Sequence, residues 1–475
     1  MDRRDRWLIV GAGPAGLSAA RALRTAGVPF DIVERHRDVG GIWDLENVGT
    51  PMYESAHFIS SKTLSGFDGF PMPGHYPDYP GQPLLLEYIR AFAEHYDLRR
   101  HVEFGVEVTR ATPTGDASWN VELSRGDRRR YRGVLAAVGH NWDPIVPDYP
   151  GVFSGEAYHS VRYRSPTEFD HQRVLIVGGG NSACDIACDA ATRAARTVIS
   201  MRRGYHFLPK HVFGKPTDAF FRSGPHLSPR IAQPLLTGLL KLLVGDLRRF
   251  GLPAPDHRVL ESHPIMNTQL LDFLAHGDAS ARPDVVRLDG RHVHFRDDTS
   301  EEFDVIVWAT GYRPTIPFLD GVFPSRSGIG PELFGALFPG VPNLYVLGHF
   351  ESDGGAYPLV SKQAEIVARL AESDATAPEA TQQWVARLTA ANRPDLSGGV
   401  RYVRSIRHAN YAQFETYDAY LSRLLRQIRR ELLKGPHLKT LHLVSGSSGS
   451  SGGDPGAEPR TAELPNDTSR TNQIL

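Results

Sequence analysis

The chain has 475 residues, more than a single hydrophobic core usually accommodates, so two or three domains are expected. Hydrophobic residues make up 41% of the sequence, and the formal net charge of −1 gives no electrostatic reason to expect nucleic acid as a partner. The two cysteines, Cys184 and Cys188, match neither a disulfide framework nor a Cys-x-x-Cys redox pair, and no signal peptide fits the amino terminus. We therefore expect a cytoplasmic protein.

Residues 7–34 predict a strand, a turn, a helix and a second strand. An apolar run at 7–10 leads into Gly-Ala-Gly-Pro-Ala-Gly at 11–16, and an alanine-rich helix follows. The first glycine of such a turn makes the bend, the second lets backbone approach a pyrophosphate, and the third allows close helix–strand packing. Glu34, at the end of the second strand, is placed to accept hydrogen bonds from a ribose diol. The unit therefore predicts a dinucleotide site with the phosphates at the helix N-terminus.

Two adjacent glycines follow this unit, and Ile42 and Trp43 come directly after them. Glycines allow backbone to lie close to a flat ligand, and Trp43 could pack beside such a ligand. The alternative is a plain tight turn in which Trp43 is a core aromatic residue. The sequence leaves both interpretations open.

A second unit of the same kind occupies residues 173–201. A strand at 173–177 leads into Gly-Gly-Gly-Asn-Ser-Ala at 178–183, then a helix and a strand at 197–201; the third position of the turn accepts alanine. Where an acid would select an unphosphorylated ribose, the chain has Arg202 and Arg203. Guanidinium groups there favour the 2′-phosphate of NADPH. The alternative is that both arginines only solvate a strand end.

The repeated unit predicts an α/β fold with two doubly wound, Rossmann-type dinucleotide-binding domains. Strand-then-glycine segments at 134–140 and 304–312 lie where the chain would cross between domains, so we expect the second domain to be inserted in the first. The predicted ranges are 1–150 and 301–443 for the first domain, 151–300 for the second with a helical insertion near 215–265, and 444–475 for a disordered tail.

Within the insertion, residues 231–250 are rich in leucine. Pro234, Lys241 and Asp246 interrupt the run, so it cannot form a transmembrane segment. We expect an amphipathic helix that covers a core, and a helix at a membrane surface or a substrate entrance is the alternative.

Several motifs in one order along most of the chain carry a resemblance to a known family. They are the two glycine-rich turns, Gly-Gly-Ile-Trp at Gly40, Phe-Pro-Met-Pro at Phe70, Tyr-Pro-Asp-Tyr-Pro at Tyr76, Val-Gly-His at Val138, Phe-x-Gly-x-x-x-His-x-x-x-Tyr at 153–163, Phe-Gly-Leu-Pro at Phe250 and Ala-Thr-Gly-Tyr at Ala309. In these motifs the chain resembles the flavin-containing monooxygenases. The resemblance implies FAD and NADPH as cofactors, O₂ and a small organic molecule as substrates, and it is compatible with a homodimer. It also implies that the 153–163 segment links the domains and touches the nicotinamide cofactor.

The turns and the resemblance together predict the residues that contact the cofactors. They are Gly11, Gly13, Pro14, Ala15, Gly16, Glu34, Gly41, Ile42, Trp43, His159, Tyr163, Gly178, Gly180, Asn181, Ser182, Ala183, Asp185, Arg202, Arg203, Thr310 and Gly311. The sequence shows no metal-ligand spacing and no nucleophile–base pair, which fits a reaction that depends on the chemistry of its cofactors.

The loop Phe-Ile-Ser-Ser-Lys at 58–62 departs from the family pattern. Many relatives carry Asn three residues before the lysine, close to the flavin and the nicotinamide amide, and Ile59 occupies that place here. An aliphatic side chain cannot form a hydrogen bond, so Ser60 or Ser61 would have to substitute through a shift of the loop by one residue. Ile59, Ser60 and Ser61 are therefore the candidate catalytic positions, on which the lifetime of the oxygenating intermediate depends.

The resemblance implies a monooxygenase that activates O₂ as a flavin hydroperoxide and oxygenates a soft nucleophile, either an amine nitrogen or a sulfide sulfur. The related Baeyer–Villiger enzymes usually carry Trp where this chain has Tyr163, which favours heteroatom oxygenation over ketone oxygenation. An uncoupled NADPH oxidase, which Ile59 suggests, also stays open as a function. So does a non-catalytic flavoprotein scaffold.

Overall fold

The computed structural model of the chain describes residues 1–224, 228–322, 337, 340–390 and 394–433. The first of its two large sheets has the strand order β3-β2-β1-β6-β5-β4, and β20 also pairs with β6. The strands are β1 (Asp2–Val10), β2 (Phe30–Glu34), β3 (Val102–Phe104), β4 (Val108–Pro113), β5 (Trp119–Leu123), β6 (Arg128–Ala136) and β20 (Leu344–Val346). All neighbours are parallel except at β5, which is antiparallel to both β4 and β6.

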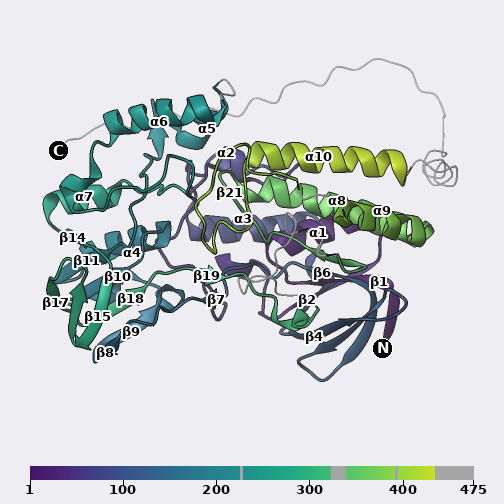
Figure 1. The fold of residues 1–475 in the computed structure, drawn as a ribbon. Helices are drawn as coiled ribbons and strands as arrows, with labels where there is room; N and C mark the ends of the chain where they lie inside the picture. Colours follow the sequence, from purple (N-terminus) through teal and green to yellow (C-terminus); the bar gives the residue numbers. More distant parts are fainter. Residues whose placement is uncertain (225–227, 323–336, 338–339, 391–393, 434–475) are drawn as a thin grey trace, which may run out of the picture. The chain divides into compact units, whose positions relative to one another are not determined.

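The first helix packs on this sheet as the sequence predicts. α1 (Pro14–Thr25) begins with proline, whose fixed φ suits the first helical position, and it buries Leu17 and Leu23. α8 (Ala356–Thr376) lies against α1, and α10 (Phe414–Glu431) lies against α8 (Figure 1). The remaining helices and the short strand pair of this part are α2 (Lys62–Ser65), α3 (Gln82–His95), α9 (Pro378–Ala390), β21 (Glu351–Ser352) and β22 (Tyr411–Ala412).

The second large sheet is fully parallel, in the order β14-β11-β10-β18-β9. Its strands are β9 (Glu156–His159), β10 (Arg173–Val177), β11 (Arg196–Ser200), β14 (Ala279–Arg282) and β18 (Val305–Trp308). α4 (Asn181–Ala191) and α7 (Gln269–His276) cover one face, with Ile186 and Leu270 in its apolar cluster. A smaller sheet of β8 (Gly151–Phe153), β15 (Val285–Gly290), β16 (His292–Phe295) and β17 (Ser300–Glu302) covers the other face. The α/β fold class with two Rossmann-type units is confirmed.

The second unit is inserted in the first. The chain leaves the first sheet after β6 and returns to it at β20, which pairs with β6. On the way out and back it forms β7 (Asp143–Pro144) and β19 (Tyr312–Arg313), which pair with each other. Val305–Trp308 pairs with β10 and β9, so this strand belongs to the second sheet although the predicted boundary at residue 300 assigned it to the first domain. The other domain boundaries stay predictions, and the tail predicted at 444–475 lies outside the described residues.

The helical insertion contains a hairpin of β12 (His211–Val212) and β13 (Lys215–Pro216), then α5 (Thr217–Arg222) and α6 (Pro229–Leu243). α6 buries Leu236 and Leu240 in an apolar cluster, as predicted for a helix that covers a core, whereas Ile231 and Leu235 are exposed. The helices within the described ranges include none that is both long enough and apolar enough to cross a membrane.

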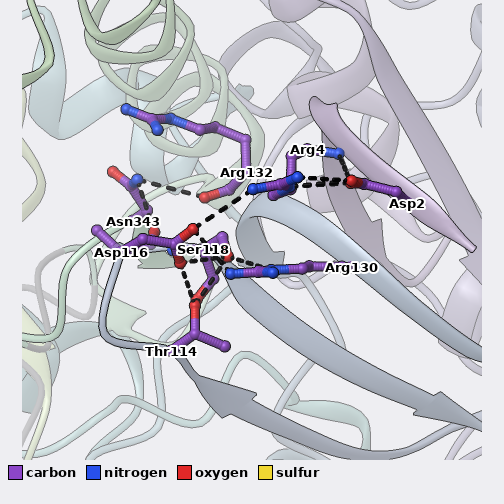
Figure 2. Close-up of polar contacts among 9 residues, drawn as sticks. Asp2, Arg4, Thr114, Asp116, Ser118, Arg130, Arg132 and Asn343 are labelled. Carbon is purple, nitrogen blue, oxygen red and sulfur yellow. Dashed lines mark hydrogen bonds and ion pairs between the residues drawn. The ribbon is translucent and has the colours of Figure 1, made fainter.

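A polar network joins the amino-terminal strand to the β4–β5 hairpin (Figure 2). One oxygen of Asp116 accepts hydrogen bonds from Thr114 at 2.5 Å and Ser118 at 2.7 Å, and the other accepts from Arg130 at 2.7 Å. These bonds hold the pKa of Asp116 well below its usual range, with the Thr114 bond as the largest cause. Arg4 lies 3.7 Å from the same carboxylate. Because the charged side chains are exposed, the network orders the hairpin but contributes little free energy.

A less exposed ion pair joins the two parts of the first domain. The guanidinium of Arg132 on β6 pairs with the carboxylate of Asp374 on α8, whose side chain is only 2% exposed. Replacing Arg132 with methionine would leave this carboxylate buried without its partner, so we expect the free energy of unfolding to fall by about 3 kcal/mol. Urea unfolding followed by circular dichroism measures the change.

The matched control is the double variant Arg132→Met with Asp374→Leu, which removes both charges. Since no charge is then left uncompensated, this variant should recover most of the lost stability. An Arg132→Met protein as stable as the unmodified chain would show that the pair does not hold the two parts together.

Candidate functional site

The first glycine-rich turn has the geometry of a phosphate-binding turn. Gly11 has a φ of +104°, and its N–H donates to the carbonyl of Val33 at 2.8 Å. A Cβ on Gly16 would lie 1.9 Å from the carbonyl oxygen of Gly11, so only glycine lets α1 begin this close to β1. No side chain of the described residues caps the N-terminus of α1. Its N–H groups and the helix dipole therefore attract an anion at this point.

Glu34 stands at the end of β2, beside the first turn. Its buried carboxylate accepts hydrogen bonds from the N–H of Ala12 at 2.6 Å and of His36 at 2.9 Å. Burial raises the pKa of Glu34, but the hydrogen bonds from His36 and Ala12 outweigh it, and the net shift is downward. The ionised carboxylate retains lone pairs that ribose hydroxyls could use, and that contact stays a prediction.

The turn at 40–43 packs directly on the first glycine-rich turn. Gly41 has a φ of +59°, and a Cβ on it would lie 3.0 Å from the Cα of Gly13. The ring of Trp43 is buried edge-on against that of Phe58, with 5.1 Å between centroids. The structure therefore brings Gly41 and Ile42 to the first site and gives Trp43 the surroundings of a core aromatic residue. Its contact with a flavin stays a prediction.

His349 is a residue that the sequence-based prediction missed. The loop after β20 lies against α1, because a Cβ on Gly348 would be 3.3 Å from the Cβ of Ala15. His349 is 2% exposed, and neither ring nitrogen forms a well-aligned hydrogen bond within the described residues, although the backbone of Gly139 lies close to the ring. Burial lowers its pKa to about 3, so the neutral ring keeps one donor and one acceptor for a polar ligand. The repeated Gly-His after a strand, also found at His140, is the pattern that could have revealed it.

The second turn repeats this geometry at the end of β10. Gly178 has a φ of +148°, and a Cβ on it would lie 2.2 Å from the carbonyl oxygen of Ala309. Gly180 has open space around its Cα, and α4 has no side-chain cap among the described residues. Asn181 does not face that space, because its side chain accepts from the N–H of Met266 at 2.7 Å and donates to Pro264 at 3.2 Å. Ser182 is exposed and Ala183 is buried.

The two arginines after β11 differ in their surroundings. Arg203 donates to Asp256 at 2.9 Å, whereas Arg202 is exposed and has no ion pair within the described parts of the chain. Arg202 is therefore the guanidinium that is free to meet a 2′-phosphate.

His159 links the two crossing segments. Its Nδ1 accepts from the N–H of Val161 at 3.1 Å, so its Nε2 carries the proton and donates to Gly311 at 3.1 Å. Burial lowers the pKa of His159 to about 4, which keeps the ring neutral. Thr310 donates a hydrogen bond to the carbonyl of Ile145 in the same crossing region. These contacts give His159 and Gly311 a structural connection, and their contact with a cofactor stays a prediction.

Tyr163 has no exposed surface. Its ring stacks on Phe169 at 5.0 Å, and its hydroxyl donates to Asp189 on α4 at 2.8 Å. Burial raises the pKa of Tyr163 far above its usual value, so the hydroxyl remains a donor. A direct contact with a cofactor is a prediction that this buried position does not favour.

Asp185 faces the first domain from α4. It accepts from the hydroxyl of Tyr53 at 3.1 Å and from Asn267 at 2.6 Å. A cavity of about 160 Å³ lies next to it, and Ser55 and Asp189 also line this cavity. Tyr53, Ser55 and Asp189 carry no motif, so only the fold brings them together.

The loop with Ile59 lies under α6. Ile59 packs against the apolar cluster that contains Leu236 and Leu240. Ser60 accepts from Ser65 at 2.7 Å, and Ser61 is fully buried with its N–H bonded to Asp218 at 2.6 Å. The three candidate catalytic residues are thus adjacent, but both serines are already held by neighbours.

No metal site competes with these assignments in the described part of the chain, where no group of three or more His, Cys, Asp or Glu side chains is arranged to hold an ion. Cys184 and Cys188 are buried free thiols, and burial raises the pKa of both. They behave as small apolar residues of the α4 core.

Comparison with known proteins places the chain in a family. Residues 4–446 match the model of the flavin-binding monooxygenase-like family, so the chain belongs to that family. It is 30% identical over 366 residues to probable indole-3-pyruvate monooxygenase YUCCA9 of Arabidopsis thaliana, covering 73% of this chain and 86% of the relative. It is also 30% identical over 400 residues to N-oxide-forming dimethylaniline monooxygenase 2 of Rattus norvegicus, covering 78% and 74%. The predicted resemblance and enzyme class are confirmed.

Solved structures agree on the fold. A flavin monooxygenase from Stenotrophomonas maltophilia superposes with a TM-score of 0.61 at 25% identity, over 79% of this chain and all 100% of that chain. Cyclohexanone monooxygenase bound to ε-caprolactone gives a TM-score of 0.67 at 17% identity, over 91% and 99%. At 17% identity the likeness shows the fold alone.

The close approach at Gly16 yields a test of the flavin site. Replacing Gly16 with alanine would push α1 away from Gly11, so we expect the purified protein to lose most of its bound flavin, measured by visible absorbance. The matched control is Gly74→Ala, since a Cβ on Gly74 meets nothing within 4 Å. Full flavin content in the Gly16→Ala protein would show that this turn does not hold the flavin.

Proposed function

We propose that the chain is an FAD-containing, NADPH-consuming monooxygenase that oxygenates an amine nitrogen or a sulfide sulfur of a small organic molecule. The observation that carries this proposal is the pair of uncapped helix N-termini, each at a glycine turn at the end of a buried parallel strand. The family membership supports the flavin, and Arg202 supports the phosphorylated nicotinamide nucleotide. The buried ring of His349 beside α1, which forms no well-aligned hydrogen bond within the described residues, fits a polar cofactor there.

In the proposed reaction NADPH supplies two electrons, one oxygen atom of O₂ is added to the substrate and the other leaves as water with two protons. The flavin, when bound, supplies the electron transfer and the oxygen activation that no side chain provides. The contributions of the chain are to bind the two nucleotides at the turns, to orient their rings and to exclude water from them.

The Ile59 loop determines how well water is excluded and which hydrogen bonds are offered. Ile59 contributes apolar surface to the cluster under α6, and it has no polar atom for a hydrogen bond. The hydroxyl of Ser61 is bonded to Thr63, and that of Ser60 accepts from Ser65 and keeps a proton to donate. Neither hydroxyl offers both polar groups of an amide side chain. This supports a second candidate function, an NADPH oxidase in which electrons reach O₂ without oxygenating a substrate.

A product assay separates these functions. The substrates are a tertiary amine, a thioether and a cyclic ketone. We expect an N-oxide from the amine or an S-oxide from the thioether and no product from the ketone, with part of the NADPH electrons released as hydrogen peroxide. Because Asn supplies a hydrogen bond worth about 1 kcal/mol, Ile59→Asn should lower the ratio of peroxide to product roughly fivefold. Product is measured by mass spectrometry and peroxide by a peroxidase assay.

Ile59→Val is the control, since it changes volume but adds no hydrogen bond. Peroxide as the sole product with every substrate, in both variants and the unmodified enzyme, would establish the oxidase. A lactone from the ketone without any N- or S-oxide would establish a Baeyer–Villiger enzyme instead.

The choice of nicotinamide nucleotide depends on Arg202. Replacing Arg202 with glutamine removes a charge-assisted hydrogen bond to the 2′-phosphate, so KM for NADPH should rise about tenfold while KM for NADH stays unchanged. Arg203→Gln should have a smaller effect because Arg203 already pairs with Asp256. Equal effects of Arg202→Gln on both nucleotides would mean that this arginine only solvates the strand end.

A further inference from the structure

Two acidic side chains on α4 hold tyrosines from two different parts of the chain. Asp185 and Asp189 are one helical turn apart. Asp185 accepts from the hydroxyl of Tyr53 at 3.1 Å, and Asp189 accepts from that of Tyr163 at 2.8 Å. The two rings contact each other, with 5.5 Å between centroids. The result is a ladder of two tyrosine–aspartate pairs along one face of the helix.

The ladder joins three segments with different tasks. Tyr53 precedes the Ile59 loop of the first domain by six residues, and Tyr163 ends the segment that crosses between the domains. α4 begins at Asn181, directly after Gly180, where the second nucleotide would bind. Tyr53 also belongs to the apolar cluster of the second domain, so the start of the Ile59 loop is built into the core around α4.

Asp189 is the residue on which two of these segments meet. The same oxygen that accepts from Tyr163 also accepts from the hydroxyl of Ser55 at 2.5 Å. Burial raises the pKa of both Asp189 and Tyr163, and the Tyr163 hydroxyl remains protonated as a donor. One carboxylate oxygen thus fixes the distance between the crossing segment and the chain that leads to Ile59.

Packing alone does not fix this distance. The cavity of about 160 Å³ lies between α4 and the first-domain segment, and it is lined by Ser55, His57, Asp185, Asp189, Lys210 and Asn267. Lys210 lies 2.5 Å from the Nε2 of His57 across this space. Because the cavity leaves this side of the contact without apolar packing, the polar contacts add to the packing of Tyr53 in determining how the two segments sit.

We propose that Asp189 is a positioning residue that sets the Ile59 loop, and with it the flavin face, against the nicotinamide nucleotide whose phosphates bind at the start of α4. The inference rests on the proposed function, since it assumes that the two turns hold FAD and NADPH. Asp189 touches neither nucleotide in this arrangement and acts through Tyr163 and Ser55. Its loss should therefore change the alignment of the two rings more than the binding of NADPH.

Anaerobic reduction of bound FAD by NADPH, followed by rapid mixing, measures alignment and binding separately. For Asp189→Asn, whose amide oxygen can still accept both bonds but without the charge, we expect the limiting rate of flavin reduction to fall about tenfold, because bonds to a charged acceptor are about twice as strong as neutral ones. The NADPH concentration at half-saturation should change less than about threefold, because Arg202 and the α4 N-terminus are untouched. Asp170→Asn, at an exposed aspartate of the same domain, is the matched control and should change neither value.

A double-mutant cycle tests whether Asp189 acts through its hydrogen-bond partners. Tyr163→Phe should reproduce most of the loss in rate, and Ser55→Ala less of it, since Ser55 is exposed. When Tyr163 is already phenylalanine, Asp189→Asn should lower the rate by less than about threefold more. If the Asp189→Asn protein does not retain FAD, the single variants Tyr163→Phe and Ser55→Ala test the proposal instead. A fall in their limiting rate of flavin reduction would support it, and an unchanged rate would contradict it.

An unchanged limiting rate in the flavin-containing variants would overturn the proposal, as would full additivity of Asp189→Asn and Tyr163→Phe. Flavin reduction needs neither O₂ nor an organic substrate. If no oxygenated product formed, the proposed function would be wrong, but the rate of flavin reduction could still be measured and would still test the role of Asp189.

Discussion

The close approach of backbone to backbone at the two glycine turns is the constraint on which the rest of the structure depends. At the first turn a Cβ on Gly16 would meet Gly11 at 1.9 Å, and at the second a Cβ on Gly178 would meet Ala309 at 2.2 Å. Each contact fixes a helix N-terminus at the carboxyl ends of parallel strands, where the loops after neighbouring strands also gather. Glu34 and His349 lie beside the first turn because Glu34 ends β2 and His349 follows β20, two strands that end there. Asp189 lies on the helix that starts at the second turn.

The connection between the domains follows from the same helix. Tyr53 and Ala56 of the first domain belong to the apolar cluster that covers α4, and the hydroxyl of Tyr53 is bonded to Asp185. A close-packed cluster transmits a displacement, so α4 cannot move without moving this segment. The carboxylates on α4 also restrict how the segment is oriented on the helix, because hydrogen bonds restrict orientation more strongly than apolar contacts do. The proposed nucleotide site at one end of α4 and the Ile59 loop are therefore mechanically linked.

Sequence patterns predict what is local and miss what depends on tertiary contacts. The strands, turns and helices at 7–34 and 173–201 are predictable because glycine spacing and apolar periodicity act over a few residues. Val305–Trp308 cannot be assigned to a sheet from its apolar run alone, since pairing with β10 decides it. Tyr163 matches a motif, but its burial against Phe169 and its bond to Asp189 come from partners outside that motif. His349 escapes prediction because its burial beside α1 depends on the return of the chain at β20, far along the sequence from the first turn.

Ile59 shows how two requirements of one site compete at a single position. An oxygen-transferring site must keep water out and must also offer hydrogen bonds to the groups that react. Ile59 serves the first requirement, since it joins the apolar cluster with Leu236 and Leu240 beneath α6. It has no polar atom for the second. The Ser61 hydroxyl is bonded to Thr63, whereas the Ser60 hydroxyl accepts from Ser65 and keeps its own proton to donate. In the proposed reaction, the apolar cover over the loop then limits the loss of electrons to peroxide by excluding water, beside any bond that Ser60 donates. Under this proposal, the fraction of NADPH electrons that reaches product depends on how α6 and the tyrosine–aspartate ladder of α4 hold the loop.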